Sequence, residues 1–351
     1  MVESYSKVEY MKVFFYTELE EKMMISGLGK AIEHQKRAAT QAGITYTTDP
    51  DDDYDILHIN TWLPKSYLVA LRAKLAGKKI VYHAHSTEED YRDGFILGHQ
   101  TAWLIHWWLV RCYSLGDIIV TPSPYSSKLL QGYKGLENKQ FRVISNGVDT
   151  DYFCHDAEKG EAFRKIYGFA PDDKVIMGIG LYIRRKGITD FVELARRFPE
   201  YKFIWFGYSS LKAATHDVRE AVKNSPANLT WAGYVDKQTI KAAMSGADLF
   251  IFPTLEETEG IPVIEACACG QDAIIRDIPA FEGWLEDGKN VYKAKDVDAF
   301  EAKIRDFFDG KLPSLKEAAL QVAKERDLKL IGSQLRDVYE EVMAMKTDNS
   351  Q

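Results

Sequence analysis

Short apolar runs bounded by glycine, proline or polar residues recur along the chain, and each predicts a buried strand of a parallel sheet. Amphipathic stretches follow several of them and predict helices. The alternation of strand and helix occurs in both halves and predicts two doubly wound, Rossmann-like α/β domains. The strand runs lie at or within residues 12–16, 55–60, 77–90, 117–128, 141–153, 174–188, 201–207, 229–236 and 249–252, and helices are expected near 31–42, 189–198, 237–247, 262–270 and 328–345.

A charged stretch, 154–173, separates the halves and reads as a linker with a short helix. A length of 351 residues suits two domains. We therefore expect a first domain over 1–153, a second over 154–327 and a final helical segment over 328–351. The first ten residues are polar and without a strong pattern, and Met11 could be an alternative start.

Composition excludes several classes of protein. The chain is 46% hydrophobic and 28% charged, as in soluble globular proteins, and its net charge of -7 argues against general nucleic-acid binding. We expect neither a membrane-spanning helix nor a signal peptide. The cysteines at 112, 154, 267 and 269 have neither a CxxC nor a zinc-site spacing, which predicts reduced thiols in the cytosol.

The segment 247–270 combines a buried strand, an acidic loop and a helix. Gly260 supplies a flexible joint, and Pro262 suits the first position of the helix. A helix start at the end of a parallel strand favours anions, yet Glu257 and Glu265 lie here with seven residues between them. Carboxylates accept hydrogen bonds from hydroxyls, so we expect a ligand with both phosphate and hydroxyl groups, which is a nucleotide sugar.

This segment resembles the E-x7-E signature of glycosyltransferase family 4, and the run 146–153 resembles the family's interdomain boundary. The resemblance covers nearly all of the chain after residue 10. It implies the GT-B fold, with two facing Rossmann-like domains, an interdomain cleft and a C-terminal helix that packs back on the first domain. It also implies a retaining enzyme in which Glu257 grips the sugar and stabilises its cationic ring, while Glu265 accepts from the ribose. The donor would also contact Thr258, Glu259, Gly260 and Ile261.

The loop after the strand in 174–188 holds Arg184, Arg185 and Lys186. It is either a solvated basic turn or a clamp for the donor diphosphate, and we favour the clamp because cations stabilise the leaving group. Family members have arginine directly after the glycine and lysine five residues later. Lys186 fits the lysine, but Leu181 occupies the arginine position, so Arg184 or, as we favour, Arg185 would supply the charge.

Three other glycine-containing turns are candidates for donor contacts. Gly27 and Gly29 form either a tight, well-packed turn or a loop whose backbone approaches a phosphate, and the family comparison favours the loop. Gly207 ends a predicted strand. By resemblance, Tyr234 and Val235 would line the uracil site, although this turn also suits a plain strand-to-helix connection.

His83 and His85 lie on the same side of an extended chain at the end of a strand, where α/β sites form. The resemblance favours His85 as the residue that orients a sugar hydroxyl, with His83 as second choice. A metal at this pair would need a third ligand that we cannot identify. The aspartates in 49–55 are better explained as a solvated acidic turn, so we expect no metal and no other cofactor.

The stretch 91–117 is rich in tryptophan. At helical spacing, Trp103, Trp107 and Trp108 are expected to share roughly one side with Arg111 or Tyr113. Ordinary core packing and an interfacial helix lying on an anionic membrane are equally good explanations. Burial of Trp107 and Trp108 in the core would exclude the second.

The runs 83–90 and 256–260 resemble bacterial synthases of galactosyl- and glucosyl-diacylglycerol. This implies transfer of galactose or glucose from a UDP-hexose to a membrane glycolipid, such as glucosyl-diacylglycerol, by a cytoplasmic protein peripheral at the inner face of the cell membrane. The alternatives are a glycosyltransferase of polysaccharide or teichoic acid synthesis, with a soluble or polyprenyl-linked acceptor, and a non-catalytic GT-B partner subunit.

Overall fold

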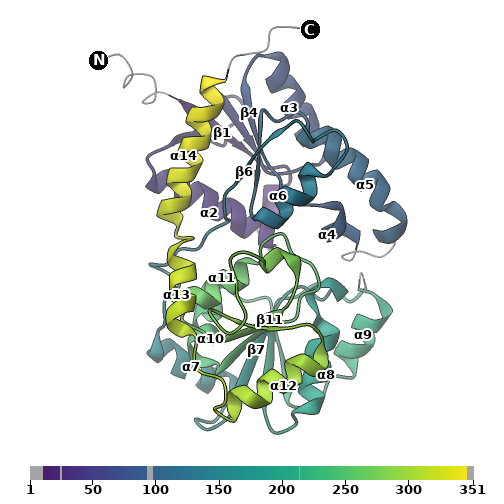
Figure 1. Ribbon diagram of the computed structural model, residues 1–351, viewed down its shortest axis with the longest axis vertical. Coiled ribbons are helices and arrows are strands. Elements are labelled where there is room, and N and C mark those ends of the chain that lie inside the picture. The colour runs from purple at the N-terminus through teal and green to yellow at the C-terminus, as the bar shows by residue number, and fades with distance from the viewer. Residues whose placement is uncertain (1–10, 24–25, 93–97, 213, 346–351) are drawn as a thin grey trace. The chain divides into compact units, whose positions relative to one another are not determined.

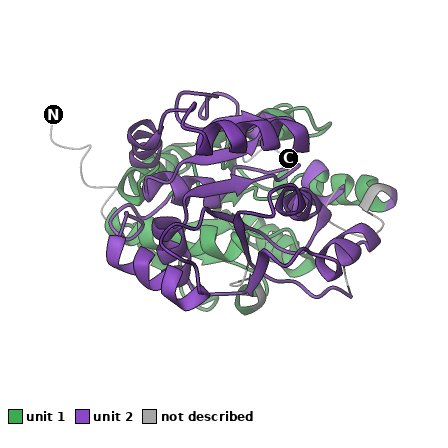
Figure 2. Cartoon of the chain, turned by 90° about the horizontal axis from the view of Figure 1, so that it is seen from below, with its two compact units in different colours: residues 1–88, 101–147, 326–351 green, residues 89–100, 148–325 purple. Residues whose placement is uncertain are grey.

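A computed structural model describes residues 11–23, 26–92, 98–212 and 214–345 (Figure 1). The segment 1–10 and residues 93–97 of the predicted membrane segment therefore lie outside the described residues. The chain divides into two compact units (Figure 2). The first unit consists of Met1–Glu88, Thr101–Gly147 and Arg326–Gln351, and the second of Glu89–Gln100 and Val148–Glu325. The sequence pattern predicted a continuous 1–153, without the transfer of Glu89–Gln100 to the second unit.

The first unit is built on a six-stranded parallel sheet in the order β2-β1-β3-β4-β5-β6. Its strands are β1 (Lys12–Tyr16), β2 (Thr45–Thr47), β3 (Ile56–Ile59), β4 (Lys79–His83), β5 (Ile118–Thr121) and β6 (Gln140–Val143). Its helices are α1 (Glu20–Met23), α2 (Gly27–Gln41), α3 (Pro64–Leu75), α6 (Pro124–Gln131) and α14 (Leu328–Ala344). The short α4 (Glu88–Arg92) and the aromatic α5 (Gly98–Tyr113) adjoin the transferred segment.

Alternation of side chains places apolar residues of each strand on both faces of this sheet. Val13 and Phe15 of β1 pack in a core with α2 and α14, whereas Phe14 faces a second core with α3 and α5. The C-terminal helix α14 thus belongs to the first unit, as the fold prediction required. It approaches α2 closely, because a Cβ at Gly332 would lie 2.3 Å from the carbonyl oxygen of Ala38.

The second unit repeats the architecture with a parallel sheet in the order β12-β11-β10-β7-β8-β9. Its strands are β7 (Val175–Ile179), β8 (Lys202–Phe206), β9 (Leu229–Gly233), β10 (Leu249–Phe252), β11 (Ala273–Arg276) and β12 (Tyr292–Ala294). Its helices are α7 (Ala157–Tyr167), α8 (Ile188–Arg197), α9 (His216–Lys223), α10 (Lys237–Gly246), α11 (Ile261–Ala268), α12 (Val297–Phe308) and α13 (Lys316–Lys324), with 3₁₀ turns η1 (Arg184–Lys186) and η2 (Pro279–Phe281).

Two helix starts differ from the sequence prediction in ways that bear on the site. The helix expected from residue 31 begins at Gly27, because the Ser26 hydroxyl caps it by accepting a hydrogen bond from Gly29 N at 3.3 Å. The helix expected to start at Pro262 begins one residue earlier, at Ile261, after Gly260 in a left-handed conformation. The two glycines predicted to form a loop therefore lie in the first turn of α2.

Candidate functional site

The acidic loop between β10 and α11 folds back on the basic turn η1. Gly187 makes this possible, because a Cβ there would lie 2.1 Å from the carbonyl oxygen of Pro253. Backbone contacts hold the two loops, with Leu255 N donating to Arg185 O at 2.7 Å. The Thr254 hydroxyl lies 3.1 Å from the same oxygen. A close backbone approach at the ends of β7 and β10 thus places the basic and acidic loops in contact.

Lys186, Arg185 and Glu257 meet in this place, as the sequence analysis proposed for the donor site. Lys186 Nζ forms an ion pair with Glu257 Oε1, which also accepts from the Thr254 hydroxyl at 2.9 Å. Arg185 Nη1 lies 3.7 Å from Glu257 Oε2 and donates to the carbonyl oxygen of Glu256 at 2.8 Å. The three charged side chains are at most 16% exposed, so their interactions are only weakly screened by water.

The electrostatics keep the Glu257 carboxyl ionised. Burial by itself would raise the pKa of Glu257, but Lys186 and Arg185 outweigh it and hold the pKa below its ordinary value. Burial lowers the pKa of Lys186, and Glu257 opposes that shift. The arrangement offers two cations beside a carboxylate that can only accept hydrogen bonds.

Asp90 is a member of this cluster that the sequence analysis did not select. Its Oδ1 lies 2.9 Å from Arg185 Nη1, within the second unit. Burial raises the pKa of Asp90, although Arg185 opposes the shift. The signal that could have found it was its place in the run 83–90, which we had used only for resemblance.

The two other positions considered for the family arginine lie differently. Arg184 is 67% exposed and lies 3.7 Å from Asp217. Leu181 is half-buried in the turn after β7, where its carbonyl oxygen accepts from Ile183 N. Among the arginines considered, Arg185 is therefore the one whose guanidinium lies beside Lys186 and Glu257.

The remaining predicted donor residues of the second unit occupy neighbouring turns and the start of α11. Gly207 N donates to Gly233 O at 2.7 Å, and a Cβ at Gly207 would lie 2.4 Å from Gly180 O, so the turns after β7, β8 and β9 are in contact. Tyr234 is 61% exposed and Val235 is half-buried. Around α11, Glu259, Gly260, Ile261 and Glu265 are buried and Thr258 is half-buried.

In the first unit, the predicted histidines lie at the end of β4, in a buried polar cluster. The rings of His83 and His85 stack at 4.2 Å between centroids, which confirms that both lie on one side of the strand. His83 is fully buried and His85 is half-buried. Burial lowers the pKa of His85 to about 3, so its imidazole is neutral at physiological pH. The partners of these rings, which were not predicted, are Gln35, His58 and Asn60, and His58 in turn contacts Tyr339.

The aromatic helix α5 is not buried as a whole. Trp103 is 67% exposed and Trp107 is 54% exposed, one turn apart, and the Arg111 guanidinium lies 5.3 Å from the Trp107 ring. Trp108 instead donates its indole N–H to the carbonyl oxygen of Trp62 at 2.6 Å, and Tyr113 is buried. The grouping of all the tryptophans on one side was therefore wrong, but an exposed aromatic stripe remains.

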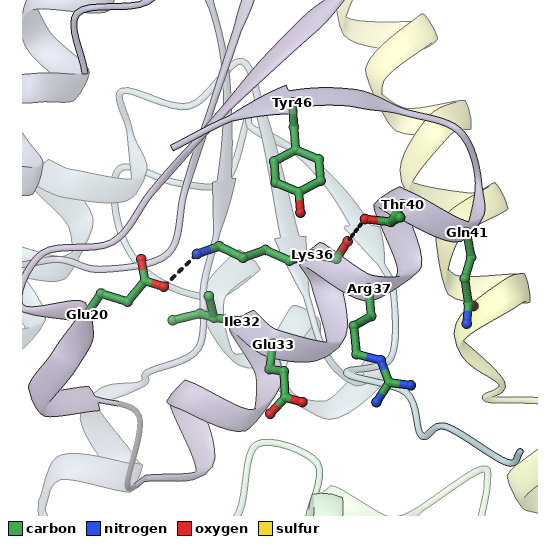
Figure 3. Close-up of a pocket in the computed structure, with 8 residues that line it drawn as sticks. All are labelled: Glu20, Ile32, Glu33, Lys36, Arg37, Thr40, Gln41 and Tyr46. Atoms are coloured by element: carbon green, nitrogen blue, oxygen red, sulfur yellow. Dashed lines mark hydrogen bonds and ion pairs between the residues drawn. The ribbon is translucent and has the colours of Figure 1, made fainter. Parts of the chain in front are cut away.

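Other features of the described residues do not add to the site. A cavity of about 310 Å³ beside α2 has none of the predicted site residues in its lining (Figure 3). Its charged wall includes the ion pair of Lys36 with Glu20, at 2.5 Å. Lys12 and Lys78 pair with Asp52 and Asp53 in the acidic turn. In the described ranges, no group of three His, Cys, Asp or Glu side chains could hold a metal, no helix is long and apolar enough to cross a membrane, and all four cysteines are free.

Family models and solved structures of other proteins match this chain. The model of the family "Glycosyltransferase Family 4" matches residues 36–152, and that of "Glycosyl transferases group 1" matches residues 159–326. The chain resembles a solved sucrose-phosphate synthase from Thermosynechococcus elongatus with a TM-score of 0.76 and 16% identity, over 95% of this chain and all of that one. It also resembles Anabaena Alr3699/HepE in complex with UDP-glucose, with a TM-score of 0.72, 16% identity and the same coverage. The fold is that of a GT-B glycosyltransferase.

Two relatives of this chain are named as enzymes that glycosylate diacylglycerol lipids. A processive diacylglycerol alpha-glucosyltransferase from Acholeplasma laidlawii is 37% identical over 336 residues, which are 96% of this chain and all of the relative. An alpha-galactosylglucosyldiacylglycerol synthase from Streptococcus pneumoniae is 23% identical over 75% of this chain and 71% of its own length. The chain belongs to glycosyltransferase family 4, and it is a glycosyltransferase.

Proposed function

We propose that this enzyme transfers glucose or galactose from a UDP-sugar to a membrane glycolipid such as glucosyl-diacylglycerol. The observation that carries the donor half of this proposal is the buried cluster of Lys186, Arg185 and Glu257. The acceptor half draws on the relatives, whose names describe glycosylation of diacylglycerol lipids.

The cluster suits the charges that develop during transfer. Lys186 and Arg185 would bind the diphosphate and stabilise its negative charge as the bond to the sugar breaks. Glu257, held ionised, would accept hydrogen bonds from sugar hydroxyls and stabilise the cationic ring. Glu265 and the turn at Tyr234 and Val235 would hold the nucleoside. Since two cations already face the diphosphate, we expect no metal requirement, and we expect retention at the anomeric carbon without a covalent intermediate.

A surface of the first unit supports peripheral contact with an anionic membrane. The aromatic stripe of α5 adjoins α3, because Arg111 Nη2 donates to the Tyr67 hydroxyl at 3.3 Å. Helix α3 exposes Leu68 and Leu75, at 50% and 81%. It also exposes Lys65, Arg72 and Lys74, and residues 56–87 contain no acidic residue. Exposed tryptophans beside basic residues are typical of proteins that bind the headgroup region. Such contact would place the enzyme at the inner face of the cell membrane.

The decisive experiment measures the transfer of labelled hexose to lipid. Labelled UDP-glucose and UDP-galactose are each incubated with diacylglycerol and glucosyl-diacylglycerol in mixed vesicles, and labelled lipid is measured. We expect labelled glycolipid from the unaltered enzyme and at least a hundredfold lower turnover for Glu257→Gln, about the effect of removing one electrostatic stabiliser. Glu286→Gln, on an exposed carboxylate paired with Lys289, is the matched control. Absence of labelled lipid from every donor and acceptor would refute the proposal.

Membrane contact is tested separately by flotation with vesicles that contain anionic lipid. The double variant Trp103→Ser and Trp107→Ser should float about tenfold less than the unaltered protein, because two interfacial side chains are lost. Ile166→Ser removes an even more exposed apolar side chain, 78% exposed, from α7 of the second unit and should float normally. If the unaltered protein does not float, a soluble acceptor is favoured.

A further inference from the structure

A chain of hydrogen-bonding side chains runs through the first unit from α14 to His85. The Tyr339 hydroxyl lies 2.7 Å from His58 Nδ1, and His58 Nε2 lies 3.3 Å from His83 Nδ1. The Gln35 amide of α2 then connects the two stacked rings, with its Nε2 position 2.9 Å from His83 Nδ1 and 3.2 Å from His85 Nε2. Asn60 Oδ1 lies 3.1 Å from the same His85 nitrogen. The members of this chain come from two strands and two helices.

The proton arrangement in this chain can be deduced by counting. All three rings are neutral at physiological pH, because burial lowers the pKa of each. A neutral imidazole has one N–H and one lone pair, so each ring nitrogen either donates or accepts. With the Asn60 oxygen toward the ring, that oxygen accepts, and His85 Nε2 carries the proton.

Gln35 must then turn its oxygen toward both rings, in place of its nitrogen. The oxygen and nitrogen of an amide have nearly the same shape, so the protons around them decide the orientation. With the oxygen facing the rings, it accepts from His85 Nε2–H and from His83 Nδ1–H, and His58 Nδ1–H donates to Tyr339. In the opposite arrangement, N–H groups of Gln35 and Asn60 would both point at the single lone pair of His85 Nε2. N–H groups of Gln35 and His58 would likewise both point at the single lone pair of His83 Nδ1. In the unturned orientation, the Gln35 oxygen at the far end of the amide is buried without a hydrogen-bond partner, so turning the amide breaks no hydrogen bond there.

We propose that Gln35 is a positioning residue whose side-chain oxygen holds His85 as the Nε2–H tautomer, leaving the Nδ1 lone pair to accept a hydrogen bond from a sugar hydroxyl. This rests on the proposed function only for the identity of the ligand. His85 is the one ring of the three that is not fully buried, so it is the ring that can meet a substrate. His83 and His58 would serve to keep Gln35 in one orientation.

The tautomers are measured on the whole protein, without ligand, by ¹⁵N NMR of histidine-labelled samples assigned with single histidine substitutions. We expect His85 as Nε2–H and His83 as Nδ1–H. In Gln35→Leu, His85 should become a mixture of tautomers and kcat should fall about tenfold, while KM for the UDP-sugar changes less than about twofold. Gln35→Glu keeps acceptor oxygens toward both rings, but its charge also favours protonation of the imidazoles, so it should restore the tautomer and most of kcat only above the raised pKa of His85. Gln41→Leu, at an exposed position of the same helix, should change neither.

Either of two results would overturn the proposal: His85 protonated at Nδ1 in the unaltered protein, or unchanged kcat in Gln35→Leu. Failure of the proposed function would look different. The unaltered enzyme would then transfer no hexose to lipid while the NMR spectrum still showed the expected tautomers, and only the sugar as ligand of His85 would be withdrawn.

Discussion

The two units share one architecture but differ in the chemistry at the ends of their strands. In the first unit, the ends of β3 and β4 hold neutral imidazole and amide groups in a hydrogen-bonded chain. In the second, the ends of β7 and β10 hold a buried cluster of charges, with Lys186 against Glu257 and Arg185 against Asp90. Both sites lie where doubly wound sheets form their binding sites.

The difference shows that the fold determines where a site lies, and the side chains determine which ligand group it suits. A neutral, desolvated cluster suits hydroxyl groups, because it can donate or accept without a charge to neutralise. A cluster with two cations suits a diphosphate.

Loss of a single cation should disable the charged site. Lys186→Met keeps the length of the side chain but removes its charge, and it leaves Glu257 buried with less compensation. We expect kcat/KM for the UDP-sugar to fall by about 10²- to 10³-fold, or about 3–4 kcal/mol. Lys293→Met is the control, since Lys293 is also largely buried and lies 3.6 Å from a carboxylate, on Asp277. An equal loss of kcat/KM in both variants would mean that the loss comes from breaking a buried ion pair in general and not from the site at Lys186.

Helix packing can be weakened in one unit at a time. Gly332→Ala would place a Cβ 2.3 Å from Ala38 O in the first unit, and Gly160→Ala would place one 2.7 Å from Ser245 O in the second. Each forces a backbone shift, and we expect a loss of about 2–3 kcal/mol in the free energy of unfolding measured with urea. At Gly27 a Cβ would meet no atom within 4 Å, so Gly27→Ala should cost nothing by comparison.

The two sites should also respond to acid over different pH ranges. Burial, together with His85, lowers the pKa of His58 to about 3 in the folded state, against an ordinary value near 6.5. The unfolded chain therefore takes up the proton first, and stability falls as the pH drops from about 6.5 toward 3. At pH 5 this amounts to about 2 kcal/mol. Glu257 has a lowered pKa, so its contribution is complete above about 4.5 and is lost only below that value.

This pH contrast is measured by urea unfolding between pH 4 and pH 8. His58→Asn should reduce the dependence between pH 5 and pH 7, leaving the part due to His83 and His85, whose pKa values burial also lowers. Glu257→Gln should leave that range unchanged and alter only the acidic end. A dependence that is the same in His58→Asn and in the unaltered protein would contradict the assignment of a neutral, buried imidazole.

The smallest effect is expected at Asp90. Its pKa is raised, so the ionised form costs stability above that pKa and the cost disappears as the carboxyl is protonated. Asp90→Asn should therefore stabilise the protein at pH 7 relative to pH 4, by less than about 1 kcal/mol, in thermal unfolding. Asp277→Asn, at a mostly exposed carboxylate, is the control. A loss of stability at pH 7 would show that the Arg185 pair outweighs the burial of Asp90.

Much of the donor site could be predicted because its parts are local in sequence. The apolar run 249–252, the spacing of Glu257 and Glu265, and the basic run 184–186 are each visible within a few residues. The start of α2 could not be placed from its apolar residues, since Ser26 and two glycines form its first turn. Glycines are poor helix formers, and the cap outweighed that propensity.

Strand–helix alternation and short motifs depend on neighbouring positions, so they were readable from the amino-acid sequence alone, together with the family and the charged residues of the proposed donor site. Only the tertiary structure decided which arginine joins Lys186, that Asp90 completes the cluster, and that Gln35, Asn60 and Tyr339 surround the histidines. These partners are separated by many residues along the chain. Contacts of that kind depend on how helices pack on a sheet, and no local pattern of residues specifies them.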